Sequence, residues 1–347
     1  MPKVLTELIS APCIKKLDKP ILTSADLPYE SMLVFNAGVV KYNGKYVMVF
    51  RNDYGTTPER YIKERHMPGT SIGVAFSDNG IDGWQVRNRH LLDNHRTLEE
   101  TGREFRRFYD PRVTIIEGKP YVCMALDTKH GVRGAIAELD ENFETVNVLS
   151  ISAPESRNMV LFPEKIGGKF VRLERPMWGG HHTEIWCSKS PDLRYWGETE
   201  LVIDDRTMPF TNDKIGCGAP PIKTDKGWLT TFHAVDVDES RTKNGWEDKW
   251  VRRYTGGIML LDLENPSKIV AMSKKPLIAP DMPYETDEGF RHNVIFPGGM
   301  ILEDDGEVKI YYGASDTYEC VATAHVDDLV KLCLENNWLD EQVINRS

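Results

Sequence analysis

The stretch DPRVTIIEGKPYVCMALD, residues 110–127, indicates the fold class of this chain. One apolar run leads into a Glu-Gly-Lys turn at 117–119, and a second apolar run ends on Asp127. Two apolar runs on either side of a short glycine turn are typical of a β-hairpin. Pro111 favours an extended conformation for Asp110, which predicts a carboxylate at the mouth of a strand. For this motif alone, an aspartate that caps its own turn is the alternative.

The same hairpin unit occurs five times along the chain. Each copy has an apolar run, a glycine-containing turn and a second apolar run that ends on, or leads to, a polar residue. The turn glycines are Gly44, Gly118, Gly168, Gly227 and Gly306. Five units of roughly 60 residues, each long enough for a four-stranded antiparallel sheet, predict an all-β, five-bladed β-propeller. A β-sandwich with chance similarity between its hairpins is the alternative fold.

A helical pattern is convincing only near the C-terminus, where Leu329 and Val330 belong to an apolar stripe that follows two aspartates. We predict a C-terminal helix over about 326–341 that covers an end of the propeller. No domain boundary or low-complexity tract interrupts the sequence, so residues 1–347 are expected to form one domain.

Two long segments, 54–70 and 236–254, are charged and rich in Arg, Lys and Trp. Long ordered loops in compact folds usually have a function. We expect them to form rims of the active site or contacts in a homo-oligomer. Their aromatic residues Tyr54, Trp246 and Trp250 can stack on a sugar or lie in such a contact.

Composition and charge argue against several classes of function. The net charge of −10 speaks against general binding of nucleic acid or anionic membranes, so a bound anion requires a local basic cluster. The N-terminus lacks the apolar core of a signal peptide, and no apolar run is long enough to span a membrane. The six cysteines show no CxxC pair and no metal-ligand spacing. We therefore expect a soluble cytoplasmic protein with reduced cysteines and no metal site.

The five repeats predict where the polar ends of the strands meet. The innermost strands of a propeller surround a central channel, so equivalent strand ends come together at one mouth. The second strands end on or lead to Arg51, Asp127, Arg175, His233 and Asp316, and the first strands begin at Asn36, Asp110, Lys214 and His292-Asn293. These positions predict a pocket lined by carboxylates and cations.

The residue types at this mouth indicate glycoside chemistry. A carboxylic acid can protonate a leaving glycosidic oxygen while a nucleophile approaches the anomeric carbon. An inverting hydrolase needs a second carboxylate to activate water, whereas Arg, Lys and His suit a phosphate dianion. Phosphate already carries negative charge and can attack without a general base. The pattern therefore favours phosphorolysis over hydrolysis, with a cation set made of Arg51, Arg65, Arg175, Lys214 and His233.

Structural roles remain open for several of these residues. Arg175 and Lys214 can each form an ion pair with a neighbouring carboxylate. His233 can be a buried, hydrogen-bonded histidine, and Asp127 and Asp316 can cap turns.

Two adjacent histidines, His181 and His182, follow Trp178. Neighbouring side chains point apart on a strand and no third ligand is evident, which argues against a metal site. Contacts to a sugar, or a place on the rim, are expected for this segment.

Several motifs resemble those of one known family. They are YDPRV (109–113), VLFPEK (160–165), VRLERPM (171–177), KIGCGAPPI (214–222), NVIFPGGMI (293–301) and YYGASDT (311–317). They are similar to glycoside hydrolase family 130, and the resemblance covers about residues 30 to 332. It implies a five-bladed propeller of β-mannoside phosphorylases, a family with a smaller branch of β-mannosidases. That branch replaces parts of the basic set with carboxylates, and this chain does not.

The resemblance also implies roles for individual residues. Asp110 is expected to be the general acid and to act through the mannosyl 3-hydroxyl as a proton relay. The phosphate-binding role falls on Arg51, Arg65, Arg175, Lys214 and His233. Positions that hold the mannosyl unit match Asn36, Asp53 and Asp316, and Tyr109 and His182 are further candidates for contact with the sugar.

The stretches RNDYG, GGIMLLDLENPSK and GFRHNVIFPGGMILE look most like the subgroup that acts on 4-O-β-D-mannosyl-D-glucose. The expected reaction is inverting phosphorolysis of this β-1,4-mannoside to α-D-mannose 1-phosphate and glucose. Inorganic phosphate is the co-substrate, and no metal or organic cofactor is expected. The alternatives are a β-1,4-mannooligosaccharide phosphorylase, a β-mannosidase that uses water, and a carbohydrate-binding propeller without activity.

Overall fold

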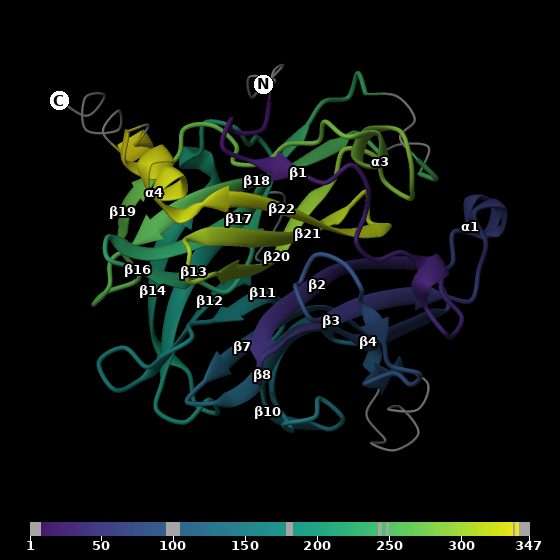
Figure 1. Ribbon diagram of the computed structural model, residues 1–347, viewed down its shortest axis with the longest axis horizontal. Helices are drawn as coiled ribbons and strands as arrows, with labels where there is room; N and C mark the ends of the chain where they lie inside the picture. The colour runs from purple at the N-terminus through teal and green to yellow at the C-terminus, as the bar shows by residue number, and fades with distance from the viewer. Residues whose placement is uncertain are drawn as a thin grey trace.

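Five antiparallel sheets follow one another along the chain and surround a common centre (Figure 1). The computed structural model describes residues 8–94, 105–177, 183–241, 245–247, 250–335 and 337–339. The first strands of the sheets contact one another, since β2 touches both β7 and β20 and β11 touches both β7 and β15. The prediction of an all-β, five-bladed propeller is confirmed, and the β-sandwich alternative is wrong.

The strands of the five sheets have the following bounds. The first sheet contains β2 (Leu33–Tyr42), β3 (Lys45–Tyr54), β4 (Gly69–Ser77), β5 (Gln85–Val86) and β6 (Leu92–Asp93). The second contains β7 (Phe105–Ile116), β8 (Lys119–Thr128), β9 (Gly131–Leu139) and β10 (Val146–Ile151). The third contains β11 (Ser156–Leu161), β12 (Phe170–Pro176), β13 (Glu184–Ser190) and β14 (Gly197–Asp204). The fourth contains β15 (Lys214–Cys217), β16 (Ile222–Thr224), β17 (Gly227–Val237), β18 (Arg252–Leu261) and β19 (Ile269–Met272). The fifth contains β20 (Ile295–Leu302), β21 (Glu307–Ala314), β22 (Tyr318–His325) and β1 (Lys15–Lys16).

The N-terminal strand closes the ring. β1 pairs with β22 of the last sheet, with Lys15 opposite Thr323, and the two strands lie side by side in Figure 1. The backbone N–H of Leu22 also donates to the carbonyl of Glu319. The fifth sheet therefore combines strands from both ends of the described chain, which ties the first blade to the last.

The hairpin turns have the geometry that their glycines suggest. Asn43-Gly44, Glu117-Gly118 and Gly167-Gly168 all have positive φ at both positions, between 50° and 79°. Two successive residues with positive φ match a type I′ turn, whose twist agrees with the twist of the flanking strands. These turns fix the register of the three hairpins that they connect.

The hydrophobic core consists of layers between neighbouring sheets. Between the third and fourth sheets, the ring of Phe162 meets Trp228 edge to face at 5.3 Å. Between the first and second, Val49 and Val74 share a cluster with Val122. The apolar side chains thus pack between the blades, and the polar residues lie at the strand ends around the central axis.

The C-terminal helix α4 spans Val326–Glu335. It packs against β18, β19 and β22 through the buried side chains of Leu329 and Cys333, and so covers a seam between the fourth and fifth sheets. Asn337 forms a bridge with Ser273, and the predicted end near residue 341 lies outside the described residues.

The other helical elements are α1 (Pro58–Glu64), α3 (Pro283–Thr286) and two 3₁₀ turns, Ser24–Asp26 and Asp205–Thr207. None of the helices in the described parts of the chain is long and apolar enough to cross a membrane.

Candidate active site

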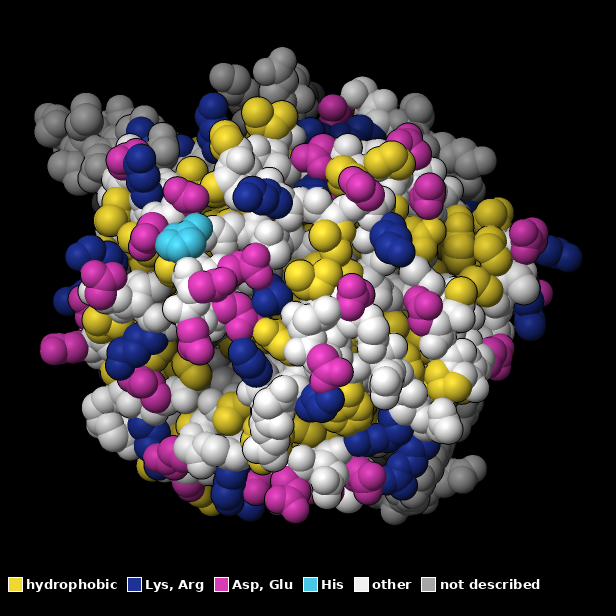
Figure 2. Space-filling view, in the orientation of Figure 1, with side chains coloured by type: hydrophobic (Ala, Val, Ile, Leu, Met, Phe, Trp, Pro, Cys, Tyr) yellow, Lys and Arg dark blue, Asp and Glu magenta, His cyan; other side chains and the backbone are white. Residues whose placement is uncertain are grey.

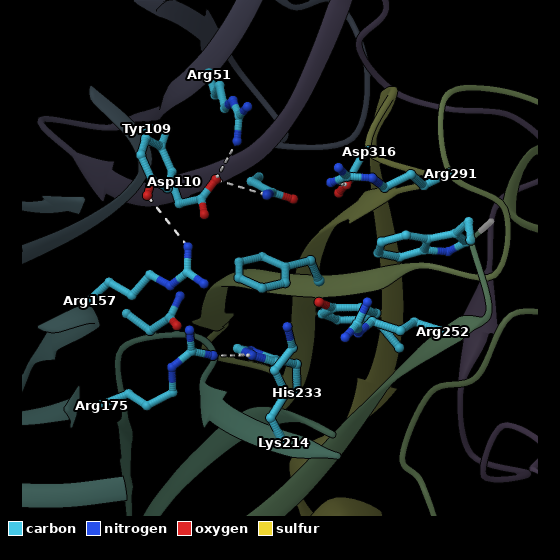
Figure 3. A pocket seen from close by; sticks show the side chains of 15 residues that line it. Arg51, Tyr109, Asp110, Arg157, Arg175, Lys214, His233, Arg252, Arg291 and Asp316 are labelled. Carbon is cyan, nitrogen blue, oxygen red and sulfur yellow. Dashed lines mark hydrogen bonds and ion pairs between the residues drawn. The ribbon is translucent and has the colours of Figure 1, made fainter. Parts of the chain in front are cut away.

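A cavity of about 260 Å³ lies where the five sheets meet, and each sheet or the loop beside it contributes to its wall (Figure 3). Eight residues proposed from the sequence line it together: Asn36, Arg51, Tyr109, Asp110, Arg175, Lys214, His233 and Asp316. The convergence of strand ends that the repeats predicted is therefore found in the structure.

Three inner strands each direct a polar side chain into this cavity by means of a β-bulge. In β2, β7 and β11, two residues face a single residue of the partner strand, which forms a β-bulge. The first residue of each bulge is Asn36, Asp110 or Asn158, with φ of 55°, 53° and 55°. A bulge redirects a side chain, and Asn and Asp tolerate this left-handed conformation better than most residues. The expectation that Pro111 makes Asp110 extended is therefore wrong.

The carboxylate of Asp110 has one occupied oxygen and one available oxygen. Its Oδ1 accepts hydrogen bonds from Asn36 Nδ2 at 2.9 Å and from Arg51 Nη1 at 3.3 Å. Within the described residues, no protein donor reaches Oδ2. The side chain is 11% exposed. One oxygen is thus fixed by the protein, and the other is available to carry a proton toward a ligand.

A cluster of cations lies across the cavity from Asp110. Figure 3 shows Arg175, His233 and Lys214 on the opposite side from Arg51 and Asp110, with Arg157 between the two groups. In the parts of the chain that the structure describes, neither Arg157, Arg175 nor Lys214 forms an ion pair. These three cations therefore lack a counter-charge of their own.

Burial and mutual repulsion affect the protonation of this cluster. Burial, and then the charge of Arg175, lowers the pKa of Lys214 to about 7. Burial, and then the charge of Arg157, lowers the pKa of Arg175 to about 9. Burial, and then the charges of Arg175 and Lys214, lower the pKa of His233 well below its ordinary value, so this histidine is neutral. A bound dianion would relieve the repulsion, which makes this side of the cavity a seat for an oxyanion.

Two other arginines of the cavity wall are paired with carboxylates. Arg51 donates to Asp53 through Nε at 3.0 Å and Nη2 at 2.6 Å. Arg291 donates to Asp316 at 2.9 Å and to Glu247 at 2.8 Å. The cavity therefore has a side with balanced charges around Asp110 and a side with excess positive charge.

The positive side differs from the outer surface. On the face shown in Figure 2, acidic and basic side chains are interspersed, and the whole chain carries a net charge of −10. The cation cluster is thus a local feature of the cavity, as the sequence required for an anion-binding protein.

Among the described residues, no ion pair joins Arg175 or Lys214 to a neighbouring carboxylate, so the ion-pair alternatives for these two cations do not hold. Glu174 is paired with Arg172, Glu164 with Lys223, and Asp213 accepts from Arg252 Nε at 3.0 Å. Asp213 still favours the charged form of Lys214 through space.

Four other candidates lie away from the cavity wall or outside the described residues. Asp53 is 2% exposed and lies behind Arg51. Arg65 is exposed at the end of α1, where its Nη1 donates to the carbonyl of Trp246 at 2.8 Å. Asp127 accepts a hydrogen bond from the hydroxyl of Tyr109 at 2.8 Å. His182, with Trp178 and His181, falls outside the described residues.

Several cavity residues were missed by the sequence analysis. They are Arg157, Asn158, Arg252, Tyr254, Arg291 and Phe296, whereas Trp250, which the sequence analysis named as able to stack on a sugar, also lines the cavity. Arg157-Asn158 occupies the place in the third repeat that Tyr109-Asp110 occupies in the second, but it lies before the apolar run that marks this repeat in the sequence. A comparison of bulge positions could have found the pair.

The two long segments meet each other beside the cavity. The hydroxyl of Tyr61 donates to Glu247 at 3.1 Å, and the rings of Tyr61 and Trp246 lie 6.3 Å apart. Glu247 in turn binds Arg291. Segment 236–254 therefore reaches the cavity wall through Trp250 and Tyr254, and segment 54–70 contacts it through Tyr61.

Among the described residues, no group of three or more His, Cys, Asp or Glu side chains is arranged to hold a metal ion.

A propeller whose central cavity has an available carboxyl oxygen opposite unpaired cations belongs to the class of glycoside-processing enzymes that also bind an oxyanion. A family model described as β-1,4-mannooligosaccharide phosphorylase matches residues 16–335. The chain belongs to glycoside hydrolase family 130, and it is an enzyme of the glycoside phosphorylase type.

Relatives with assigned activities cover most of the chain. It is 33% identical to a β-1,4-mannooligosaccharide phosphorylase of Ruminococcus albus, over 90% of this chain and 88% of that protein. It is 31% identical to a 1,2-β-oligomannan phosphorylase of a Thermoanaerobacter species, over 91% and 98%. It is 30% identical to a 4-O-β-D-mannosyl-D-glucose phosphorylase of Bacteroides fragilis, over 86% and 74%.

Solved structures agree on the fold. A β-1,2-mannobiose phosphorylase from Listeria innocua, in complex with β-1,2-mannobiose, superposes with a TM-score of 0.76. The match covers 92% of this chain and 99% of that chain, at 24% identity.

Proposed function

We propose that this enzyme catalyses inverting phosphorolysis of a β-mannoside, with 4-O-β-D-mannosyl-D-glucose as the substrate. The observation that carries the proposal is the unpaired cation cluster of Arg157, Arg175 and Lys214 across the cavity from Asp110. A hydrolase would need a carboxylate there to activate water, whereas these cations fit the nucleophile phosphate.

In the proposed reaction, the cation cluster holds phosphate on one side of the mannosyl unit. A phosphate oxygen attacks the anomeric carbon and forms the new C–O bond as the bond to the leaving sugar breaks. Asp110 supplies the proton from Oδ2 through the mannosyl 3-hydroxyl, and the leaving oxygen takes the proton. The products are α-D-mannose 1-phosphate and glucose. The reaction uses inorganic phosphate as co-substrate and no metal or organic cofactor.

The preference for a β-1,4 linkage is supported by the description of the matching family model and by two relatives, at 33% and 30% identity. The second candidate is a β-1,2-mannoside. It is favoured by the relative named 1,2-β-oligomannan phosphorylase, which aligns over 98% of its own length.

The first experiment measures turnover of the disaccharide with and without phosphate. Strict dependence on phosphate supports the proposal, and equal turnover in its absence indicates a mannosidase instead. The variant Asp110→Asn should lose turnover and largely keep sugar affinity. A wild type that binds sugar and turns nothing over would indicate a carbohydrate-binding propeller.

The second experiment runs the reaction in reverse to identify the acceptor. α-Mannose 1-phosphate is offered with glucose, mannose, N-acetylglucosamine or cellobiose, and released phosphate is measured. NMR of the product then assigns the linkage. A β-1,4 product with glucose as the best acceptor is expected, and a β-1,2 product would favour the second candidate.

A further inference from the structure

Asp53 has no free capacity to bind a sugar. Its Oδ1 accepts from Arg51 Nε at 3.0 Å and from the hydroxyl of Thr70 at 3.0 Å. Its Oδ2 accepts from Arg51 Nη2 at 2.6 Å and from Arg107 Nη2 at 3.3 Å. Two hydrogen bonds on each oxygen saturate a carboxylate. The side chain is also 2% exposed and lies behind Arg51, away from the cavity wall.

Arg51 connects this buried carboxylate to the reacting group. Two of its nitrogens bind Asp53, and its Nη1 reaches Asp110 Oδ1 at 3.3 Å. The guanidinium therefore lies between two carboxylates, with shorter contacts to Asp53. An arginine whose charge was free would hold Asp110 in the ionised form, because an opposite charge at this distance favours ionisation.

We propose that Asp53 is a positioning residue: it holds Arg51 in place and balances its charge, so that Asp110 can keep the proton that it donates to the leaving sugar. This inference rests on the proposed role of Asp110 as the general acid. It replaces the expectation that Asp53 binds the mannosyl unit.

Other charged groups face Asp110 from neighbouring elements. Arg157 on β11, Arg112 on β7 itself and Asp316 after β21 interact with it through space, as does the hydroxyl of Tyr109. Among the described residues, however, Arg51 is the only charged group that hydrogen-bonds to Asp110. These other groups are unchanged when Asp53 is replaced, so the effect of the replacement passes through Arg51.

The test replaces Asp53 by asparagine, which keeps the shape of the side chain and removes its charge. The measured quantity is the pH dependence of kcat at saturating phosphate and mannoside, where bound phosphate keeps Lys214 charged. Activity requires a proton on Asp110, so kcat falls as the pH rises. In Asp53→Asn, this fall should move to lower pH by about one unit. At a pH well above the midpoint, kcat should then drop roughly tenfold relative to wild type.

Thr70→Val is the matched control. It removes the hydrogen bond that Thr70 donates to the same carboxylate and the one that it accepts from Arg107 Nε at 3.1 Å, and it leaves every charge in place. Its kcat–pH curve should keep the wild-type midpoint, even if its overall kcat is lower. Arg107→Gln, which leaves Arg51 as the only cation bound to Asp53 among the described residues, should not move the midpoint to lower pH.

Two results would overturn the inference. One is an Asp53→Asn variant with a raised KM for mannoside and an unmoved pH curve, as a sugar contact would give. The other is an equal shift in Thr70→Val, which would indicate general disruption.

A direct titration separates this inference from the proposed function. The carboxyl group of Asp110 is followed by infrared difference spectroscopy against Asp110→Asn, in the wild type and in the Asp53→Asn background. A lower midpoint in the Asp53→Asn background supports the role of Asp53 even if the enzyme shows no phosphorolysis. An unchanged midpoint refutes that role even if phosphorolysis is demonstrated.

Discussion

Arg175 and His233 are joined by a hydrogen bond of 3.1 Å between guanidinium Nη1 and imidazole Nε2. A guanidinium has donors and no acceptor, so Nε2 accepts and the imidazole proton lies on Nδ1. Since burial keeps the pKa of His233 well below its ordinary value, the ring is neutral. His233 therefore orients Arg175 in the cation cluster and adds no charge of its own, although the sequence suggested a cation.

Replacing His233 separates orientation from charge. His233→Phe fills the same space and cannot accept the hydrogen bond, so Arg175 loses its fixed direction. The KM for phosphate should rise roughly tenfold, since a hydrogen bond to a charged group contributes about 1.5 kcal/mol or more. His233→Gln, whose side-chain oxygen can accept, should retain more of the affinity. Equal KM values for phosphate in both variants would contradict the orienting role.

The depressed pKa of Lys214, about 7, predicts a pH-dependent anion site. Below pH 7 the free lysine is charged, and above it the lysine becomes neutral and must take up a proton before it can pair with an anion. Affinity should therefore fall as the pH rises above 7, by up to about tenfold per unit. Sulfate is the better probe because it does not titrate in this range, unlike phosphate. Calorimetry from pH 6 to 9 should show weakening affinity together with proton uptake.

Lys214→Met provides the control for this titration. It should bind sulfate more weakly at pH 6 and should lose most of the dependence between pH 7 and 9. A wild-type affinity that stays constant across this range would show that Lys214 is charged throughout.

The propeller could be predicted from the sequence because its determinants are local. The glycine turns after Val40 and Ile116 and the alternating apolar runs are visible in any one hairpin, and their repetition gives the number of blades. The strand ends at Arg51, Arg175 and His233 followed from the same repeat. Local pattern was therefore sufficient both for the fold and for half of the cavity wall.

The other features of the cavity depend on backbone geometry that the apolar pattern does not encode. In its β-bulge Asp110 adopts a left-handed conformation, although the following proline favours an extended one. The same bulge at Asn158 places Arg157 in the cavity, which the apolar run alone does not reveal. Asp53 binds Arg51, two residues before it on β3, together with Thr70 and Arg107 from two other strands, and the sequence does not show that these side chains meet.

Arg157 is predicted to affect the complex with an anion more than the free protein. Its charge is the main electrostatic cause of the lowered pKa of Arg175, but against the effect of burial the hydroxyl of Tyr109 and the charge of Asp110 raise the pKa of Arg157 itself. Arg157→Gln should therefore change the melting temperature of the free protein little. The same variant should lose much of the stabilisation by sulfate, which for a ligand at 100 times its Kd is about 2.7 kcal/mol. Differential scanning calorimetry with and without sulfate measures both effects, and a large loss of stability without sulfate would contradict the prediction.

The approach of two inner strands predicts a site where a single methyl group is harmful. A Cβ on Gly298 would lie 2.1 Å from the carbonyl oxygen of Ala37, the residue after Asn36. Since both partners are backbone near the centre of the ring, neither can move without shifting the bulge that positions Asn36 and, through it, Asp110. Gly298→Ala should cost about 1–3 kcal/mol of unfolding free energy and also reduce kcat. Gly197→Ala is the matched control, because a Cβ there meets no atom within 4 Å. Denaturant unfolding and phosphorolysis assays on both variants test this, and a Gly298→Ala protein with wild-type stability would show that the two strands are further apart than the structure has them.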